Sequence, residues 1–445
     1  MKNILVLGAG RSSASLIDYL LKNSAENNWF VSVSDASLDL AIEKINGHPS
    51  GRAITFDVNN DSLLQESVSE ADIVVSLLPP SLHILAAKKC VALKTPMVTA
   101  SYVSGELASL DKQAKAAGII LLNECGLDPG LDHMSAMKII HDVKEQNEKL
   151  ISFKSYCGGL VAPECNDNPW GYKFTWNPRN VVLAGQGGDA KYLESNVVQS
   201  VSYEQLFLKT EKINVSGLGE LEAYANRDSL SYIQSYGLEG ISSMFRGTLR
   251  MPDFCVAWGA IIKLGLTDDD KKISNSGNMT WKELMTQLAP PAKDFADYPE
   301  LFSGPNSVSK KIQWLGIFSD EPVNPQARTA AQALQFLLEK KWKLSEQDKD
   351  LIVMQHEFII SRPESDTEMV FAKRKIISSL IVKGKDQIHT AMAMTVGLPL
   401  AIATKLILQG KIKSTGIVIP VLKEIYEPVL AELENLDIKF REIME

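Results

Sequence analysis

The amino-terminal third of the chain alternates short apolar runs with segments whose apolar residues recur at helical spacing. Lys2–Leu7 is a continuous apolar run, and the segment from Ser12 to Leu21 that follows it has apolar residues three and four positions apart. Further strand-like runs lie at Val31–Asp35, Ala53–Phe56, Ile73–Leu78, Pro96–Thr99 and Ile119–Leu122. Strands that alternate with helices in this way predict a parallel sheet covered by helices on both faces.

The pattern changes after Gly126. Residues 151–215 are rich in aromatic residues, Pro and Gly and contain several strand-like runs, whereas residues 251–347 are mainly polar and helical in spacing. Strand-like runs return at 350–361 and 368–382, and the apolar, Ala-rich segment 390–409 predicts a buried helix. The second part of the chain is therefore expected to be a mixed α+β domain with a helical insertion.

Length and charge narrow the class of protein. A chain of 445 residues exceeds one ordinary core, so two or three domains are expected. Lys and Arg number 46 against 54 Asp and Glu, which gives a net charge of −8 without any basic run. Such a chain would repel a phosphate backbone, so nucleic acid is not an expected partner.

Cysteine usage and hydropathy bear on the compartment. The five cysteines are odd in number and widely spread, without metal-ligand spacing, which favours a reduced intracellular environment. No apolar stretch approaches the roughly 20 residues that span a bilayer. We therefore expect a soluble cytoplasmic protein without a membrane segment.

The segment Gly8-Ala9-Gly10-Arg11-Ser12-Ser13 lies between the first predicted strand and the first predicted helix. Gly8 permits a tight turn there, and Gly10 lets the backbone approach a pyrophosphate, which a helix N-terminus attracts. Ser13 replaces the third glycine of the usual fingerprint. The motif predicts a dinucleotide-binding Rossmann domain with NAD or NADP as its cofactor.

Asp35 ends the second predicted strand. A carboxylate there accepts hydrogen bonds from the adenosine ribose and repels a 2′-phosphate, and no Arg follows to hold such a phosphate, so NAD is favoured over NADP. Asp35 could equally cap a helix that begins at Leu38, and the two roles are compatible. Because the carboxyl ends of parallel strands line the ligand crevice, further cofactor neighbours are expected at two other strand ends, namely Ser76, Leu77, Ala100 and Ser101.

Several longer strings extend over most of the chain. They are NECGLDPGLDHM at 123–134, SYCGGL at 155–160, GYKF at 171–174, NRDS at 226–229, RGTLR at 246–250 and TVGLP at 395–399. In this order they resemble the saccharopine reductase family, the L-glutamate-forming saccharopine dehydrogenases. The resemblance implies interconversion of saccharopine and water with L-glutamate and 2-aminoadipate 6-semialdehyde, in lysine metabolism, by a homodimer.

The resemblance also implies a domain plan. A Rossmann domain would comprise residues 1–126 with 388–445, an α+β substrate-binding domain residues 127–250 with 348–387, and a helical insertion residues 251–347. The sequence departs from the family pattern at Val161 and Trp170, which replace Pro and Leu, at Gln387–His389, and at Met394, which replaces a Lys. These departures leave the cofactor preference and the exact substrate open.

Saccharopine carries three carboxylates, so its enzyme needs cations, preferably Arg with its planar fork. Arg227 and Arg250 are the favoured substrate ligands, whereas Arg179 is expected to be structural. Arg246 or Arg250 could instead pair with Asp228 or Asp253. The residues that the resemblance assigns to substrate binding are Ser101, Tyr102, Asp128, Lys173, Arg227, Thr248, Leu249 and Arg250. Those assigned to the cofactor are Gly8, Gly10, Arg11, Ser12, Ser13, Asp35, Ala36, Ser37, Asp57, Val58, Ser76, Leu77, Ala100, Ser101, Leu127 and Pro129.

The proposed chemistry removes a proton from the secondary amine, transfers hydride, and adds water to the imine, so it needs acid–base groups. The candidates are Tyr102, Asp128 and Cys157, of which Cys157 is the least favoured because a free Cys is most often an inert buried residue. Asp132 is expected to be the N-cap of a helix at 133–140. Hydride transfer beside nitrogen requires no metal, so none is assigned.

Two rival functions compete with this interpretation. One is a related dehydrogenase acting on a carboxylated polyamine, such as carboxynorspermidine or carboxyspermidine. The other is a dinucleotide-binding protein without turnover, which the loss of the Lys at 394 favours. The retained Tyr102, Asp128 and arginines argue against the second rival, and a turnover assay separates all three.

Overall fold

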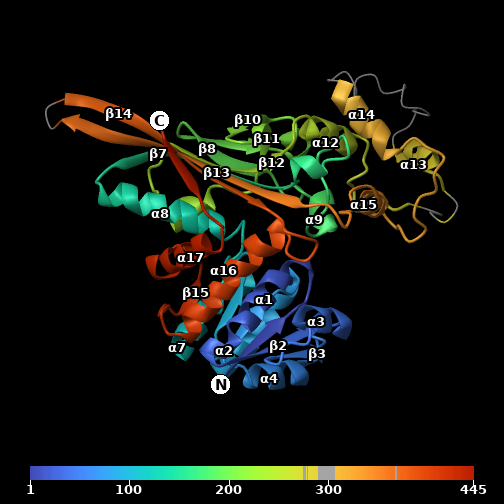
Figure 1. Cartoon of the computed structure of the whole chain (residues 1–445). Coiled ribbons are helices and arrows are strands. Elements are labelled where there is room, and N and C mark those ends of the chain that lie inside the picture. The colour runs from blue at the N-terminus through green and yellow to red at the C-terminus, as the bar shows by residue number, and fades with distance from the viewer. Residues whose placement is uncertain (274–276, 278, 289–305, 366–367) are drawn as a thin grey trace. The chain divides into compact units, whose positions relative to one another are not determined.

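The computed structural model describes residues 1–273, 277, 279–288, 306–365 and 368–445. The chain divides into two compact units (Figure 1). Unit 1 comprises Met1–Glu148 with Val382–Arg441, and unit 2 comprises Lys149–Ile381 with Glu442–Glu445. Each unit is built around its own sheet.

Unit 1 contains a seven-stranded sheet in the order β15-β6-β5-β4-β1-β2-β3, with all neighbours parallel. The strands are β1 (Lys2–Leu7), β2 (Trp29–Asp35), β3 (Gly51–Thr55), β4 (Ile73–Ser76), β5 (Met97–Thr99), β6 (Ile120–Leu122) and β15 (Gly416–Val418). The order reverses between β1 and β4, and such a switch point is where doubly wound sheets bind ligands. The predicted Rossmann-type α/β fold is confirmed.

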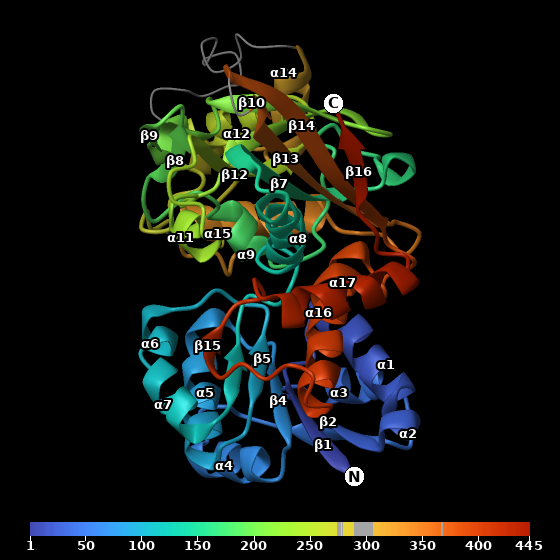
Figure 2. The same ribbon diagram turned by 90° about the vertical axis from the view of Figure 1, so that its left-hand side faces the viewer.

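Helices cover both faces of this sheet (Figure 2). Alternate residues of β1, Leu5 and Leu7, pack in a core with one group of helices, α4 (Asp61–Ser69), α5 (His83–Leu93) and α7 (Asp111–Ala117). On the other face, α16 (Ala391–Leu408) contacts β4, β5 and α1 (Ala14–Lys22). The remaining helices of unit 1 are α2 (Ser24–Asn27), α3 (Leu38–Ile45), α6 (Gly105–Ala108), α8 (Leu131–Glu145) and α17 (Lys423–Asn435).

Helix α16 is the one helix in the described part of the chain that is long and apolar enough to cross a membrane. The expectation that no apolar stretch approaches this length was therefore wrong. However, 72% of the helix is buried inside the protein, because its apolar residues pack against the sheet and α1. The length and apolar composition of α16 are therefore those of a buried core helix, as the Ala-rich pattern predicted.

Unit 2 contains a nine-stranded mixed sheet with the main order β10-β11-β12-β7-β13-β14-β16 and a side branch of β8 and β9. Its strands are β7 (Lys149–Val161), β8 (Ala190–Glu194), β9 (Val197–Val201), β10 (Thr210–Val215), β11 (Gly219–Ala225), β12 (Ser243–Arg250), β13 (Asp350–Ser365), β14 (Glu368–Lys383) and β16 (Arg441–Met444). The central pair β7 and β12 is parallel, whereas β7 and β13 are antiparallel. The predicted second domain with a mixed sheet is confirmed.

The helices of unit 2 are α9 (Pro178–Val182), α10 (Tyr203–Leu206), α11 (Ser231–Ser235), α12 (Phe254–Lys263), α13 (Trp281–Leu288), α14 (Asn306–Leu315) and α15 (Ala330–Lys341). Helices α12 to α15 fall within the predicted insertion 251–347. Their buried residues Trp258 and Leu334 share one core with Trp170 and Tyr172. The helical segment is thus part of the core of unit 2.

The compact units differ from the sequence-based boundaries. Residues 127–148 belong to unit 1, because α8 packs against α17, whereas the sequence analysis assigned them to the substrate-binding domain. The second crossing lies at Val382, six residues before the predicted position of 388. The change in sequence texture after Gly126 marks the end of the sheet and not the end of the compact unit.

Candidate active site

The glycine-rich turn follows β1 directly. Gly8 has a φ of +105°, and a Cβ atom added there would lie 3.0 Å from the carbonyl oxygen of Leu77, so both backbone and space require glycine. A Cβ at Gly10 would meet no atom within 4 Å. The fold itself does not need glycine at position 10, and the open space there fits the close approach of a pyrophosphate.

At the third position of the glycine fingerprint the chain has Ser13 in place of glycine. Ser13 is buried, and its hydroxyl donates to the carbonyl oxygen of Gly10 at 2.8 Å, which closes the turn. Close helix packing is provided instead by Gly397 of α16, where a Cβ would lie 2.9 Å from the backbone nitrogen of Leu16. Gly397 lies in the TVGLP string, but sequence reasoning assigned it no role.

Asp35 stands at the end of β2 with both carboxylate oxygens in use. One accepts the N–H of Ala9 at 2.7 Å, and the other accepts the N–H of Ser37 at 2.9 Å. Asp35 therefore fixes the glycine turn and the segment before α3, but the N-cap of α3 is Ser37, so the predicted capping role was wrong. Ribose binding by Asp35 stays a prediction. The fixed negative charge is the feature that bears on cofactor preference.

The other cofactor candidates follow strands of the same sheet. Ala36 and Ser37 follow β2, and Asp57 and Val58 follow β3, with the Asp57 carboxylate accepting the N–H of Asn59 at 2.9 Å. Arg11 and Ser12 lie in the single 3-10 turn that precedes α1. All of them follow the carboxyl ends of strands of this sheet.

A buried relay joins the ends of β4 and β5. The hydroxyl of Ser76 lies 2.8 Å from Nδ1 of His83, and Nε2 of His83 lies 2.7 Å from the hydroxyl of Ser101. Burial lowers the pKa of His83 to about 4, so the imidazole is neutral at pH 7 and its two nitrogens play opposite hydrogen-bonding roles. Sequence reasoning found Ser76 and Ser101, together with Leu77 and Ala100, but missed His83, which follows Pro79-Pro80.

The turn that carries Asp128 is closed by backbone bonds. Gly126 donates to the carbonyl of Pro129 at 3.0 Å, and Leu131 donates to the carbonyl of Gly126 at 2.9 Å. Asp128 is half-buried, and the Asp128–Pro129 peptide bond is cis. Leu127 and Pro129 are buried in this turn.

The prediction for Asp132 was wrong. Helix α8 begins at Leu131 with Gly130 as its N-cap, so Asp132 lies inside the first turn. Its carboxylate reaches back to accept the N–H of Gly130 at 2.6 Å, which still places a negative charge at the helix N-terminus.

In unit 2, two central strands bring several candidates together. Cys157 on β7 pairs in register with Thr248 on β12, and Thr248 donates to the side-chain oxygen of Asn226 at 2.7 Å. Leu249 packs so closely that a Cβ at Gly158 would lie 2.7 Å from it. Resemblance alone had grouped these residues, and the pairing of β7 with β12 supplies the physical reason.

Arg250 ends β12 and is 4% exposed. Its guanidinium carbon lies 5.1 to 5.6 Å from the ring centres of Tyr172, Tyr224 and Phe254. It donates to the carbonyl of Leu249 at 2.8 Å, while its Nε has no hydrogen-bond partner. Its other hydrogen bond within the described ranges goes to the hydroxyl of Tyr224 at 3.4 Å, and neither Asp228, Asp253 nor another carboxylate forms an ion pair with it there. Such an aromatic cage holds a cation without neutralising it.

The other predicted cations differ from Arg250. Arg179 forms an ion pair with Asp269, which confirms the structural role expected for it. Lys173 is 3% exposed and lies 2.8 Å from Asp167 and 2.7 Å from Asp348, so two carboxylates already match its charge. Arg227 is exposed. The substrate roles of Lys173 and Arg227 stay predictions, and the proposal below does not depend on them.

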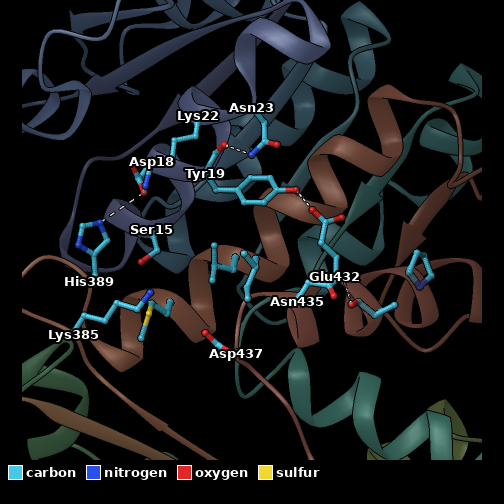
Figure 3. A pocket seen from close by; sticks show the side chains of 15 residues that line it. Ser15, Asp18, Tyr19, Lys22, Asn23, Lys385, His389, Glu432, Asn435 and Asp437 are labelled. Carbon is cyan, nitrogen blue, oxygen red and sulfur yellow. Dashed lines mark hydrogen bonds and ion pairs between the residues drawn. The ribbon is translucent and has the colours of Figure 1, made fainter.

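A pocket of about 800 Å³ lies elsewhere in unit 1 (Figure 3). It is lined by residues of α1, of 385–398 and of α17, among them Asp18, Lys22 and Met394, and by none of the residues assigned to cofactor or substrate. Lys22 pairs with Asp18 at 2.7 Å. The departure from the family pattern at Met394 therefore falls in this pocket and not among the candidate catalytic residues.

Within the described residues, no group of three or more His, Cys, Asp or Glu side chains is arranged to hold a metal ion. All five cysteines are free thiols.

Comparison with known proteins identifies two family models, one after the other along the chain. Residues 4–122 match the family model described as the saccharopine dehydrogenase NADP binding domain, and residues 126–438 match the saccharopine dehydrogenase C-terminal domain. A saccharopine dehydrogenase [NADP(+), L-glutamate-forming] of Saccharomyces cerevisiae is 35% identical over 98% of this chain and 97% of its own length. The mitochondrial alpha-aminoadipic semialdehyde synthase of Bos taurus is 36% identical over 97% of this chain, which spans 47% of that longer protein.

Solved structures agree. The apo saccharopine dehydrogenase (L-Glu forming) from Saccharomyces cerevisiae matches with a TM-score of 0.89 and 33% identity, covering 100% of both chains. The homospermidine synthase of Legionella pneumophila matches with a TM-score of 0.55 at 8% identity, which shows a shared fold alone.

Proposed function

Because the chain belongs to the saccharopine dehydrogenase family, we propose that it catalyses the dinucleotide-dependent interconversion of saccharopine and water with L-glutamate and 2-aminoadipate 6-semialdehyde. Likeness over nearly the full length to L-glutamate-forming relatives supports this reaction. The enzyme is an oxidoreductase that acts on a CH–NH group, and the reaction belongs to lysine metabolism.

The observation that carries the proposal is that the guanidinium of Arg250 is buried without a carboxylate partner in the described part of the chain. A buried charge is costly unless an opposite charge or hydrogen bonds compensate for it. Arg250 is surrounded by aromatic rings, and its Nε is left without a partner in the described structure. A planar guanidinium with donors to spare suits a carboxylate, of which saccharopine has three. Arg250 therefore binds a substrate carboxylate.

The residues of unit 1 fit a pyridine dinucleotide. The space above Gly10 is open, the first turn of helix after it presents backbone N–H groups, and Asp35 stands at the end of β2. Gly10 to Ser13 would hold the pyrophosphate, and Asp35 the adenosine ribose. When bound, this group accepts or returns the hydride of the C–H beside nitrogen.

Proton transfers fall to the chain's own side chains. Tyr102 and Asp128 are the leading candidates, because Tyr102 is exposed and Asp128 is half-buried on a turn held by backbone bonds. One of them takes the proton of the secondary amine, and the water that adds to the imine must lose its proton to a base. Cys157 lies on β7, in register with Thr248 on β12, and is the lesser candidate.

We further propose that NAD is the preferred cofactor, although named relatives use NADP(+). The Asp35 carboxylate is fixed in place by two backbone N–H groups, and it would face a 2′-phosphate with a like charge. Ala36 and Ser37, which follow it, offer no cation to offset that repulsion. The ratio of kcat/KM for NAD to that for NADP measures this preference.

We also propose a homodimeric state and a cytoplasmic location. The first rests on the resemblance to the family, and the second on the five free cysteines. Light scattering of the purified protein tests the dimer, and microscopy of a tagged chain tests the location.

The experiment that tests the proposed reaction follows reduced-nicotinamide absorbance with saccharopine and each dinucleotide in turn. Turnover with saccharopine supports the proposal. Cofactor binding without turnover of saccharopine, together with turnover of a carboxylated polyamine, would replace it with the rival dehydrogenase.

A further inference from the structure

Tyr102 lies in the short connection between β5 and α6, and its side chain is 51% exposed. A side chain on a loop moves with the backbone that carries it. The contacts of the two neighbours of Tyr102, Ser101 and Val103, therefore bear on where the phenol is placed.

Both neighbours are held by one residue. Glu124 follows β6, and its backbone N–H donates to the carbonyl of Ser101 at 3.0 Å. Its side-chain Oε1 accepts the backbone N–H of Val103 at 3.0 Å. One glutamate thus holds the chain immediately before and immediately after Tyr102.

The second carboxylate oxygen is also in use. Oε2 of Glu124 lies 2.8 Å from Nε2 of His133, a fully buried residue of α8. Glu124 is itself buried, with 8% of the residue exposed, and each of its carboxylate oxygens has a fixed partner. His133 orients the carboxylate, and the carboxylate orients the loop.

The conformation and burial of Glu124 are both energetically unfavourable. Glu124 has a φ of +56°, a left-handed conformation that side-chain-bearing residues adopt at a cost, and it also buries a carboxylate. Backbone strain of this kind persists where surrounding contacts impose it, and it gathers at functional sites. An independent contact acts on the same loop, because Nε2 of His83 holds the Ser101 hydroxyl at 2.7 Å.

We infer that Glu124, oriented by His133, is a positioning residue that fixes the backbone on both sides of Tyr102 and so places its phenol for proton transfer. The inference rests on the proposed function for the role of Tyr102. Glu124 touches neither substrate nor cofactor and acts through the loop.

The primary variant is Glu124→Ala, which removes both side-chain contacts. A displacement of a catalytic group by about 1 Å costs about 100-fold in rate, so kcat falls by about this factor while KM for the dinucleotide changes little. Glu124→Gln keeps a side-chain oxygen that accepts the N–H of Val103. Its amide NH2 can donate to Nε2 of His133 when His133 takes its other tautomer, so this variant restores most of kcat.

Two further variants separate positioning from folding. Glu124→Asp keeps the charge but shortens the side chain by about 1.5 Å, so it withdraws from Val103 with less disturbance of the buried pair. Glu424→Ala is the matched control, since Glu424 also accepts two backbone N–H groups in unit 1, those of Lys413 and Ser414 at 3.2 and 3.0 Å. The control lowers the melting temperature and leaves kcat unchanged.

The deciding experiment is a double-mutant cycle with Tyr102→Phe, read as kcat and as the pH profile of kcat. If Glu124 acts through Tyr102, then Glu124→Ala in the Tyr102→Phe background lowers kcat by only about threefold or less. The alkaline limb of the wild-type pH profile shifts in Glu124→Ala and returns in Glu124→Gln.

Each failure has its own signature. Suppose that Tyr102→Phe lowers kcat strongly. If Glu124→Ala then leaves kcat unchanged, or if its loss of kcat adds fully to that of Tyr102→Phe, the positioning role is overturned while the proposed function stands. An unchanged kcat in Tyr102→Phe itself overturns the role of Tyr102 in the proposed function, and the positioning role with it.

Discussion

The two units of this protein build their functional features from different materials. In unit 1 the features are backbone groups and short polar side chains at the carboxyl ends of parallel strands, with Gly10 and Asp35 as examples. In unit 2 the central feature is one buried cation, Arg250, enclosed by three aromatic rings that come from separate elements. The first kind is encoded locally in the sequence, whereas the second exists only after folding.

The largest expected effect concerns the charge in unit 2. Arg250→Ala should lower kcat/KM for saccharopine by about 100-fold or more, because a bound carboxylate would lose its paired charge. Arg250→Lys should recover little, since a lysine lacks the planar fork. Steady-state kinetics measures both variants.

Arg179→Ala is the control for Arg250, because Arg179 pairs with Asp269 in the same unit. It should lower the melting temperature without changing KM for saccharopine. Equal kinetic losses in both variants would show that Arg250 is a structural cation too.

The next prediction concerns Gly8 and Gly10 of unit 1, whose replacement should affect stability and cofactor binding differently. Gly10→Val should leave the melting temperature unchanged, because the space there is open, yet weaken dinucleotide binding by about 100-fold, as the side chain would occupy the place of the pyrophosphate. Gly8→Ala should destabilise the fold by about 1–2 kcal/mol through its left-handed backbone. Thermal melting and a fluorescence titration with NADH distinguish the two, and a destabilised Gly10→Val would contradict the account.

A smaller effect is expected at Asp35. Asp35→Asn keeps an oxygen for the N–H of Ala9 but removes the charge, so kcat/KM with NADP should rise relative to NAD by about tenfold. Rates with the two cofactors under equal conditions measure the change. An unaltered ratio would mean that Asp35 serves only the turn.

The smallest effect is a pH dependence of stability. The folded-state pKa of His83 is lowered by burial to about 4, against an unfolded value near 6.5, so the unfolded state binds more protons between these values. Stability should therefore fall as the pH drops below 6.5, by about 1 kcal/mol between pH 6.5 and 5.5 from this residue. His83→Gln should reduce that slope in melting experiments, and an unchanged slope would argue against a neutral buried imidazole.

The sequence predicted unit 1 better than unit 2 for physical reasons. Buried parallel strands are short apolar runs, and a turn such as Gly8 has a local signal, so β1 and the glycine turn could be placed directly. The contacts of Glu124 with Ser101 and Val103 carry no local signal, because they join residues more than twenty positions apart. Position 124 lies in a recognised string, but its role depends on tertiary structure.

Some side chains have partners that the local sequence does not reveal. Lys173 stands in a family string and carries the charge that a substrate carboxylate needs, and the structure pairs it with Asp167 and Asp348. Asp132 precedes a helical pattern, but Gly130 takes the N-cap position. In both cases the sequence identified the segment, and only the three-dimensional structure reveals the partners of the side chain.

The central claim is that this chain oxidises saccharopine on the side that releases L-glutamate, and product identity tests it most directly. The secondary amine of saccharopine has an oxidisable C–H on each side, so complete turnover can yield one of two product pairs. The account predicts L-glutamate and 2-aminoadipate 6-semialdehyde by mass spectrometry after exhaustive reaction with NAD. Lysine and 2-oxoglutarate, or unreacted saccharopine in the presence of bound cofactor, would contradict it.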